Sequence, residues 1–147
     1  MNNNWFKVKA KFVKQLEDGR LKRVTDQFLV DAVSHTEAEE RTWKELLDGI
    51  QGEVLITGIT PQSINDVISF NDEDNIWWEC VFSFRSIDGD TGNETTVKNK
   101  TLISAGEISE ALKYLKEHLQ SFNVNTHVLS IKETSIVEVL PYKPIND

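Results

Sequence analysis

The alternation of apolar and polar residues near the start of the chain predicts a β-hairpin. In residues 5–13 the even positions are apolar, whereas Trp5 and three lysines occupy the first odd positions, so one face of this strand is expected to meet a core. Asp18 and Gly19 form a strong hairpin-turn signal, and residues 22–33 supply the return strand. The expected core face of the hairpin comprises Phe6, Val8, Ala10, Phe12, Val24, Phe28, Val30 and Ala32.

A helix and two short strands are expected after the hairpin. The helix begins near Thr36, and short apolar-rich runs at residues 54–59 and 64–70 predict the strands. The apolar stripe of the helix consists of Ala38, Thr42 and Leu46.

The same order of elements occurs twice along the chain. Val30 and Ile103 are 73 residues apart, and similar residues recur at shifts of 72 or 73 from Trp5 to Tyr142. Because two unrelated segments would not return to one register, we interpret this pattern as an internal duplication. In the second copy a strand begins near Trp77, a helix begins near Glu107 or Ile108, and strands follow at residues 127–131 and 136–142.

The sequence therefore predicts an α+β fold made of two tandem β-β-α-β-β repeats. Fewer than about 75 residues per repeat is marginal for an independent core. We therefore expect the two antiparallel sheets to pack on each other, edge to edge or face to face, about a pseudo-two-fold axis. Residues 1–147 would then form one globular domain of two lobes, residues 5–70 and 76–142, joined by an acidic linker at residues 71–75.

Several of these segments resemble a known protein family. The run "WFKVKAKFVKQLEDGRLKRVTDQFLVDAVSHTEAE" and the closing "ETSIVEVLPY" resemble the uncharacterised family of Bacteroidetes bacteria and their phages called domain of unknown function 4494. The elements that carry the resemblance are an aromatic pair, "EDG", "VT", "LVDA", "TEAE" and "EVLPY", over about residues 5–142. The resemblance implies a phage or mobile-element context and supplies no substrate, cofactor or catalytic residue.

Composition and charge narrow the function classes. Hydrophobic residues make up 39% of the 147 residues and charged residues 27%, which is typical of a globular protein. The apolar runs are too short to cross a bilayer, so no membrane partner is expected, and the single cysteine fits a reducing cytoplasm. The net charge of −8 argues against bulk electrostatic capture of duplex DNA. Residues 7–23 nevertheless carry a net charge of +5, which leaves −13 for the rest of the chain.

No catalytic residue, metal site or cofactor is predicted, and we interpret the chain as non-enzymatic. Cys80 has the parity of the core face, and its equivalent in the first copy is Val8, so it is expected to fill space. The segment Asp88–Glu94 lacks the residue order of a calcium loop and is interpreted as a hairpin turn. No spacing typical of metal ligands connects the histidines, which are His35, His118 and His127.

Polar residues also gather at the repeated joint between strand and helix. Asp31 and Glu37 in the first copy match Ser104 and Glu110 in the second. Side-chain oxygens near a helix start accept backbone N–H bonds, and a glutamate in the first turn suits the helix dipole. We therefore expect helix capping at this joint in preference to acid–base chemistry.

The outward face of the first strand is the strongest candidate for a binding surface. Single-stranded nucleic-acid binders use such a combination of an aromatic ring and a row of cations to stack a base and follow phosphates. Two other interpretations stay open: the lysines protect a strand edge against aggregation, or Trp5 and its equivalent Trp77 pack between the copies. The candidate nucleic-acid-binding residues are Trp5, Lys7, Lys9, Lys11, Arg20, Lys22 and Arg23.

The expected function is that of an accessory binding protein of a phage or mobile element. It would contact single-stranded nucleic acid or a replication partner through the first hairpin, in the cytoplasm of a bacterial host. The alternative is a virion or assembly protein that acts by contact with a phage protein or by self-association. The candidate partner-binding residues for that alternative are Trp77 and Trp78.

Overall fold

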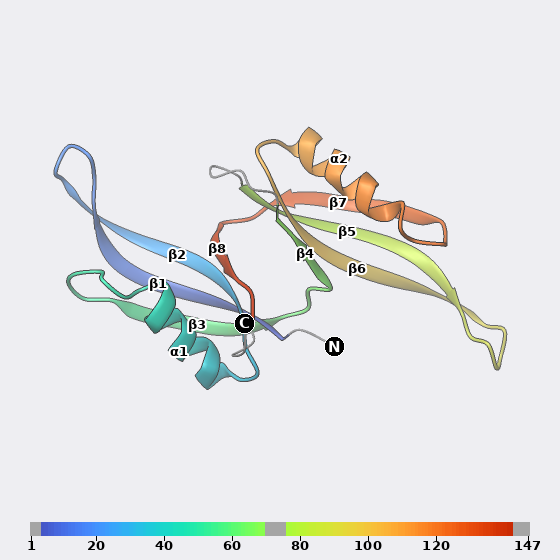
Figure 1. Cartoon of the computed structure of the whole chain (residues 1–147), viewed down its shortest axis with the longest axis horizontal. Coiled ribbons are helices and arrows are strands. Elements are labelled where there is room, and N and C mark those ends of the chain that lie inside the picture. The colour runs from blue at the N-terminus through green and yellow to red at the C-terminus, as the bar shows by residue number, and fades with distance from the viewer. Residues whose placement is uncertain (1–3, 70–75, 143–147) are drawn as a thin grey trace. The chain divides into compact units, whose positions relative to one another are not determined.

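The computed structural model describes residues 4–69 and 76–142, which form two four-stranded sheets and two helices (Figure 1). Sheet 1 has the strand order β3-β1-β2-β8, and sheet 2 has the order β4-β6-β5-β7. The predicted α+β class is confirmed. The elements are β1 (Trp5–Gln15), β2 (Leu21–Asp31), α1 (His35–Glu45), β3 (Leu55–Gln62), β4 (Asp66–Ile68), β5 (Ile76–Ile87), β6 (Glu94–Ala105), α2 (Ile108–Leu119), β7 (Thr126–Glu133) and β8 (Ile136–Leu140).

A long antiparallel hairpin forms the centre of each sheet, β1–β2 in sheet 1 and β5–β6 in sheet 2. The first hairpin turns where predicted. Gly19 there has a φ of +86°, a conformation that glycine adopts without steric cost. The segment Asp88–Glu94 contains the second turn, as predicted, and the Asp88 carboxylate accepts the backbone N–H of Asp90 at 2.8 Å.

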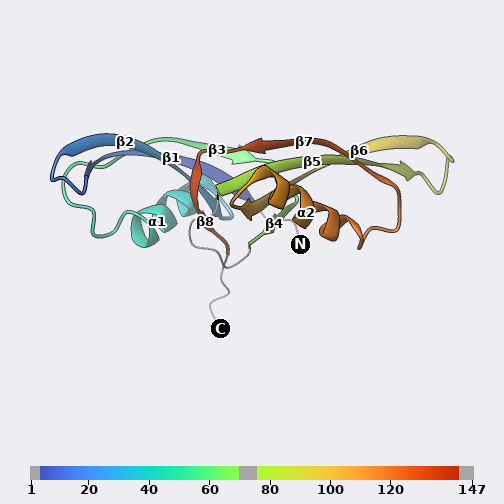
Figure 2. The ribbon, with the colours of Figure 1, turned by 90° about the horizontal axis from the view of Figure 1, so that it is seen from above.

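One helix packs against each hairpin and its neighbouring strand. In Figure 2, α1 lies on one side of β1–β3 and α2 lies on one side of β5–β7, the strands that each helix contacts. Neither described helix is long and apolar enough to cross a membrane. The other side of each sheet, which we call its outer face, is free of helix.

The start of α1 is fixed by a capping box, which confirms the capping role of Glu37. Ser34 Oγ accepts the backbone N–H of Glu37 at 3.1 Å, and Glu37 Oε1 accepts the N–H of Val33 at 3.2 Å. The helix therefore begins at His35, one residue before the predicted start. In α2, Glu110 Oε1 accepts the N–H of Gly106 at 3.1 Å. Asp31 and Ser104, the other two predicted capping residues, are buried instead in the last residues of β2 and β6.

The hydrophobic core lies between each sheet and its helix, where the alternation predicted it. Burial raises the pKa of Cys80 to about 12, and the charge of Glu79 adds to this shift. The thiol therefore stays protonated and fills space, as expected from its match with Val8. Phe12 and Val24 are only partly buried, because the hairpin extends beyond the helix. The buried core is Phe6, Val8, Ala10, Phe28, Val30, Ala32, Ala38 and Leu47 under α1, and Trp78, Cys80, Phe82, Ile103, Ala105, Ala111 and Leu115 under α2.

The two compact units do not coincide with the expected lobes, residues 5–70 and 76–142. Unit 1 consists of residues 1–63 and 135–147, and unit 2 consists of residues 64–134. The difference arises because β4 pairs with β6 and β8 pairs with β2, so each sheet takes its fourth strand from the other half of the sequence. Both pairings are parallel, which corrects the expectation of purely antiparallel sheets. Phe70 and the expected linker 71–75 lie outside the described residues.

Candidate nucleic-acid interface

Four cationic side chains share the outer face of sheet 1. Successive side chains of a strand point to opposite faces of the sheet. Lys7, Lys9 and Lys11 therefore lie on the face of β1 that points away from the core. Arg23 on β2 pairs with Val13 and shares the same outer face. Lys9, Lys11 and Arg23 are exposed, and Lys7 is half-buried. We call Lys7, Lys9, Lys11 and Arg23 the basic face.

The lysines of the basic face lie on an interior strand. In sheet 1, β1 is flanked by β3 and β2, and the edges of the sheet are β3 and β8. The interpretation that these lysines protect a strand edge is therefore wrong, because β1 is paired with both β3 and β2 at each of the three lysines. Neighbouring lysines along β1 are two positions apart, which corresponds to about 6.7 Å along a strand, and their charges repel one another.

Among the described residues, no carboxylate forms an ion pair with the basic face. None of the ion pairs among residues 4–69 and 76–142 involves any of its four side chains. Their cross-strand neighbours at the middle of the face are neutral: Gln27 and Gly58 beside Lys9, and Thr25 beside Lys11. Sheet 2 differs, because its outer face contains the ion pairs Lys100–Glu79 at 3.9 Å and Arg85–Glu94 at 2.9 Å.

Trp5 shares the parity of the basic face but is only 4% exposed. The alternation indicated the correct face of the strand, but it did not indicate that this end of the face is covered. Leu29 and Asp31, which lie beside Lys7 and Trp5 on β2, are buried as well. The Trp5 ring therefore has little surface to offer a base, and the stacking role expected of it is removed from the interface.

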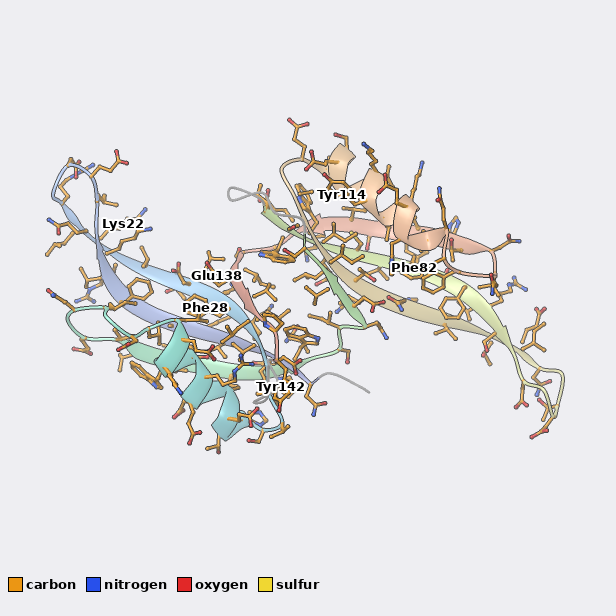
Figure 3. All side chains as sticks on the ribbon, viewed as in Figure 1. Lys22, Phe28, Phe82, Tyr114, Glu138 and Tyr142 are labelled. Atoms are coloured by element: carbon orange, nitrogen blue, oxygen red, sulfur yellow. The ribbon has the colours of Figure 1, made fainter. Side chains whose placement is uncertain are left out.

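Arg20 and Lys22 lie apart from the basic face, near the tip of the hairpin. Arg20 Nε donates to a carboxylate oxygen of Asp18 at 2.6 Å within the turn, which offsets its charge. Lys22 pairs with Lys14 and has the parity of the core face, beyond the part that α1 covers. Figure 3 shows Lys22 close to the tip, away from α1. The seven predicted residues therefore do not form one surface.

An open cleft of about 410 Å³ lies at the end of the basic face nearest the turn. Lys11 and Arg23 contribute cationic side chains to its lining, and Glu53 contributes a carboxylate. Val13 and Leu55 add exposed apolar side chains. Thr25 and two residues with the parity of the core face, Phe12 and Val24, form the rest of the lining. The cleft is within the usual size range of small-ligand sites. Sequence reasoning missed Leu55 and Glu53, because their position depends on the pairing of β3 with β1.

The candidate partner-binding residues Trp77 and Trp78 point to opposite faces of β5. Trp78 is 7% exposed and packs in the core, where its indole Nε1 donates to the Ala105 carbonyl at 2.9 Å. It therefore cannot dock a partner without unfolding the core. Trp77 is half-buried and lies on the outer face opposite Ser104.

A polar network that sequence reasoning missed joins α1 to β2 and to the end of β8. Arg41 Nη1 donates to the Asp31 carbonyl, Nη2 donates to the Pro141 carbonyl at 3.0 Å, and Nε donates to Glu45 at 3.0 Å. Burial raises the pKa of the Asp31 carboxyl, although backbone N–H groups of Tyr142 and Asn4 and the charge of Arg41 oppose this shift. The network anchors β8, which comes from the far end of the sequence.

The chain belongs to the family described as domain of unknown function DUF4494, whose model matches residues 4–142. This match confirms the resemblance seen in the sequence. No curated protein and no solved structure matches the chain significantly.

Proposed function

We propose that this protein is a non-enzymatic binding protein that takes up single-stranded nucleic acid on the basic face of sheet 1. The observation that supports the proposal is a row of cations on the interior strand β1, with Arg23 beside it on β2, that makes no ion pair with any residue the structure describes. Separated like charges on a rigid sheet are stabilised when an anionic partner lies across them. The equivalent face of sheet 2 offers no such row, because ion pairs already neutralise part of its charge.

The geometry favours an extended single strand over a duplex. Lys7, Lys9 and Lys11 form a row along β1, and their spacing of about 6.7 Å is comparable with the separation of neighbouring phosphates in an extended strand. A duplex would also bring many phosphates close to the acidic remainder of the chain, which carries −13 outside residues 7–23. A single strand can follow the row with less of this repulsion.

The burial of Trp5 lowers the expected affinity. Base stacking on an exposed aromatic ring contributes about 1–3 kcal/mol per base. The four residues of the basic face are lysines and an arginine, and the ring of Trp5 beside them is buried. Binding would then depend on phosphate contacts, tolerate any base sequence and weaken as salt is added. The apolar side chains of the cleft, Val13 and Leu55, provide a surface for sugar or base.

Charge reversal on β1 tests the proposal. We expect Lys9→Glu/Lys11→Glu to weaken the binding of a fluorescently labelled oligothymidine by roughly tenfold or more at low salt, since two phosphate contacts become repulsive. Fluorescence anisotropy of the full chain measures the change. The matched control is Lys98→Glu/Lys132→Glu, which alters the net charge equally on the outer face of sheet 2.

The proposal predicts near wild-type affinity for this control. Equal losses in the two variants would show that net charge, and not the basic face, determines binding. An absence of oligothymidine binding by the wild-type chain at low salt would contradict the proposal itself.

We also propose that the chain arose by tandem duplication of a β-β-α-β-β segment, with the two copies related by a pseudo-two-fold axis. The registers of the parallel strands support this proposal. Leu29 pairs with Val139 in sheet 1, and Leu102 pairs with Val67 in sheet 2. Moving Leu29 by 73 residues gives Leu102, and moving Val67 by 72 residues gives Val139. The pairs on either side of these two agree in the same way.

The resemblance of the chain to phage and Bacteroidetes sequences supports a role beside replicating nucleic acid in a bacterial cytoplasm, and we propose this setting.

A second candidate function, assembly with further copies of the chain in a virion or complex, is favoured by the exchange of β4 and β8 between the halves of the sequence.

A further inference from the structure

The site beside β2 in sheet 1 is filled by a strand from the far end of the sequence. β8 pairs with β2 in parallel: Phe28 with Glu138, Leu29 with Val139, and Val30 with Leu140. Leu140 packs against the core under α1, and Ile136 at the other end of β8 is buried. Arg41 holds the residue after the strand through the Pro141 carbonyl. We call this site the β2 slot.

The first half of the chain cannot fill the β2 slot with its own fourth strand. β3 and β2 both run antiparallel to β1, so β3 is parallel to β2. If β4 paired with β2 in parallel, as β8 does, β4 would also run parallel to β3. The segment between β3 and β4 would then have to cross from the end of β3 back to the opposite end of the sheet. A parallel connection of that kind needs a dozen or more residues, but only residues 63–65 separate the two strands. A strand that lies parallel to β2 in this slot therefore has to come from another part of the sequence.

The corresponding site in sheet 2 takes a strand of the same type. Asp66, Val67 and Ile68 occupy it, and Ile68 packs against the core under α2. The occupant of each slot is thus an acidic residue, a valine and a larger aliphatic residue: Asp66-Val67-Ile68 beside β6 and Glu138-Val139-Leu140 beside β2. Each slot thus binds the same type of short strand, and in each sheet this strand comes from the other half of the sequence.

We propose that the β2 slot also binds β8 of a second copy of this chain, so that two copies join by strand exchange. The exchanged strand makes the same register, core and Arg41 contacts as it does within one copy, so the two arrangements differ mainly in the entropy of association. Tethering by short segments gives effective concentrations on the order of millimolar. The single copy therefore dominates at micromolar concentration, and the exchanged dimer forms when the chain refolds near millimolar concentration.

Cysteine trapping distinguishes the two arrangements in the full chain. One chain carries Leu29→Cys and a differently tagged chain carries Val139→Cys, both with Cys80→Val to remove the native thiol. The two new thiols meet only if β8 of one copy lies in the β2 slot of the other. After joint refolding at about millimolar concentration and mild oxidation, we expect a covalent heterodimer on a non-reducing gel. Its yield should fall when refolding takes place at micromolar concentration.

Two controls make the result decisive. A chain with both Leu29→Cys and Val139→Cys should close its disulfide within one copy at low concentration, which shows that the pair is able to cross-link. A mixture of the Leu29→Cys chain with a Leu129→Cys chain measures cross-linking by random collision, since Leu129 is an exposed β7 residue of sheet 2. Absence of heterodimer above that background, while the double-cysteine chain closes, overturns the proposal.

The equivalent pair in sheet 2 provides a second test if the cysteine at Leu29 prevents folding. Leu102→Cys on one chain and Val67→Cys on the other meet in the same way when β4 is exchanged. A heterodimer from this pair supports strand exchange between copies, and its absence beside a closed double-cysteine chain contradicts it. Neither result depends on nucleic-acid binding, because the oxidation is carried out on the protein alone.

Discussion

At the scale of single residues, similar side chains have different roles because their surroundings differ. Lys9 and Lys100 both lie on an outer face, but Lys100 is close to Glu79 whereas Lys9 has neutral neighbours. The alternation of the sequence predicted the faces of the strands correctly. It could not predict that Trp5 is covered, because parity gives the direction of a side chain and not what lies above it.

Asp31 is the buried carboxyl group at the end of β2, and its ionisation should influence stability. Burial raises its pKa above the ordinary value of 3.8, so the folded state binds a proton more readily than the unfolded state. Its contribution to stability is present in full below about pH 3.8 and is lost as the pH rises through the raised pKa of the folded state. The wild-type chain is thus expected to lose stability over this window relative to a variant that cannot ionise.

Asp31→Asn tests this expectation through urea unfolding between pH 3.5 and pH 7. The free energy of unfolding of the variant minus that of the wild type should increase as the pH rises above about 3.8, and level off above the raised pKa. Glu39→Gln, on the exposed side of α1, controls for the loss of one carboxylate. A constant difference, or one that decreases with pH, would contradict the assigned direction of the shift.

At the scale of elements, the sequence predicted which strands and helices form better than it predicted which strands pair. The β1–β2 hairpin, α1, α2 and β7 form close to the expected residues, since alternation, Asp18-Gly19 and the apolar stripes are local signals. The exchange of β4 and β8 is not local. It follows from a connection of three residues between β3 and β4, too short for a parallel crossover. The sequence alone predicted a similarly short connection, residues 60–63, between these two strands.

A circular permutant tests the proposed duplication at this scale. In the sequence, residues 70–75 connect Ser69 to Ile76, and the repeat equivalents of these two residues are Pro141 and Asn4. If the copies are related by a pseudo-two-fold axis, a linker of the same length should therefore also join Pro141 to Asn4. The permuted chain would then begin at Ile76 and end at Ser69. We expect it to keep the far-ultraviolet circular dichroism of the wild type and a single thermal transition. A permutant cut between Phe82 and Ser83, inside β5, serves as the control that should fail to fold.

An unfolded or aggregated chain from the Ile76 permutant, with the control equally disrupted, would contradict the pseudo-two-fold arrangement. It would leave the observed registers of β4 and β8 unchanged, since these are properties of each sheet separately.

At the scale of the whole molecule, charge is separated along the sequence. Residues 7–23 carry +5 and the rest of the chain carries −13. The structure places four of the seven basic residues of this segment on one outer face and divides the others among the turn and the opposite face. The composition indicated that a basic segment exists. Only the strand order showed that its lysines lie on an interior strand and therefore need another explanation than edge protection.

The salt dependence of oligonucleotide binding tests whether the basic face is a nucleic-acid interface. If a single strand contacts the four cations of the basic face, the logarithm of the association constant should fall against the logarithm of salt concentration with a slope of about −2.8, at about −0.7 per phosphate contact. Lys9→Ala/Lys11→Ala should reduce the slope to about −1.4. A slope that this substitution does not change, or an absence of binding at low salt, would contradict the assignment of the basic face as a nucleic-acid interface.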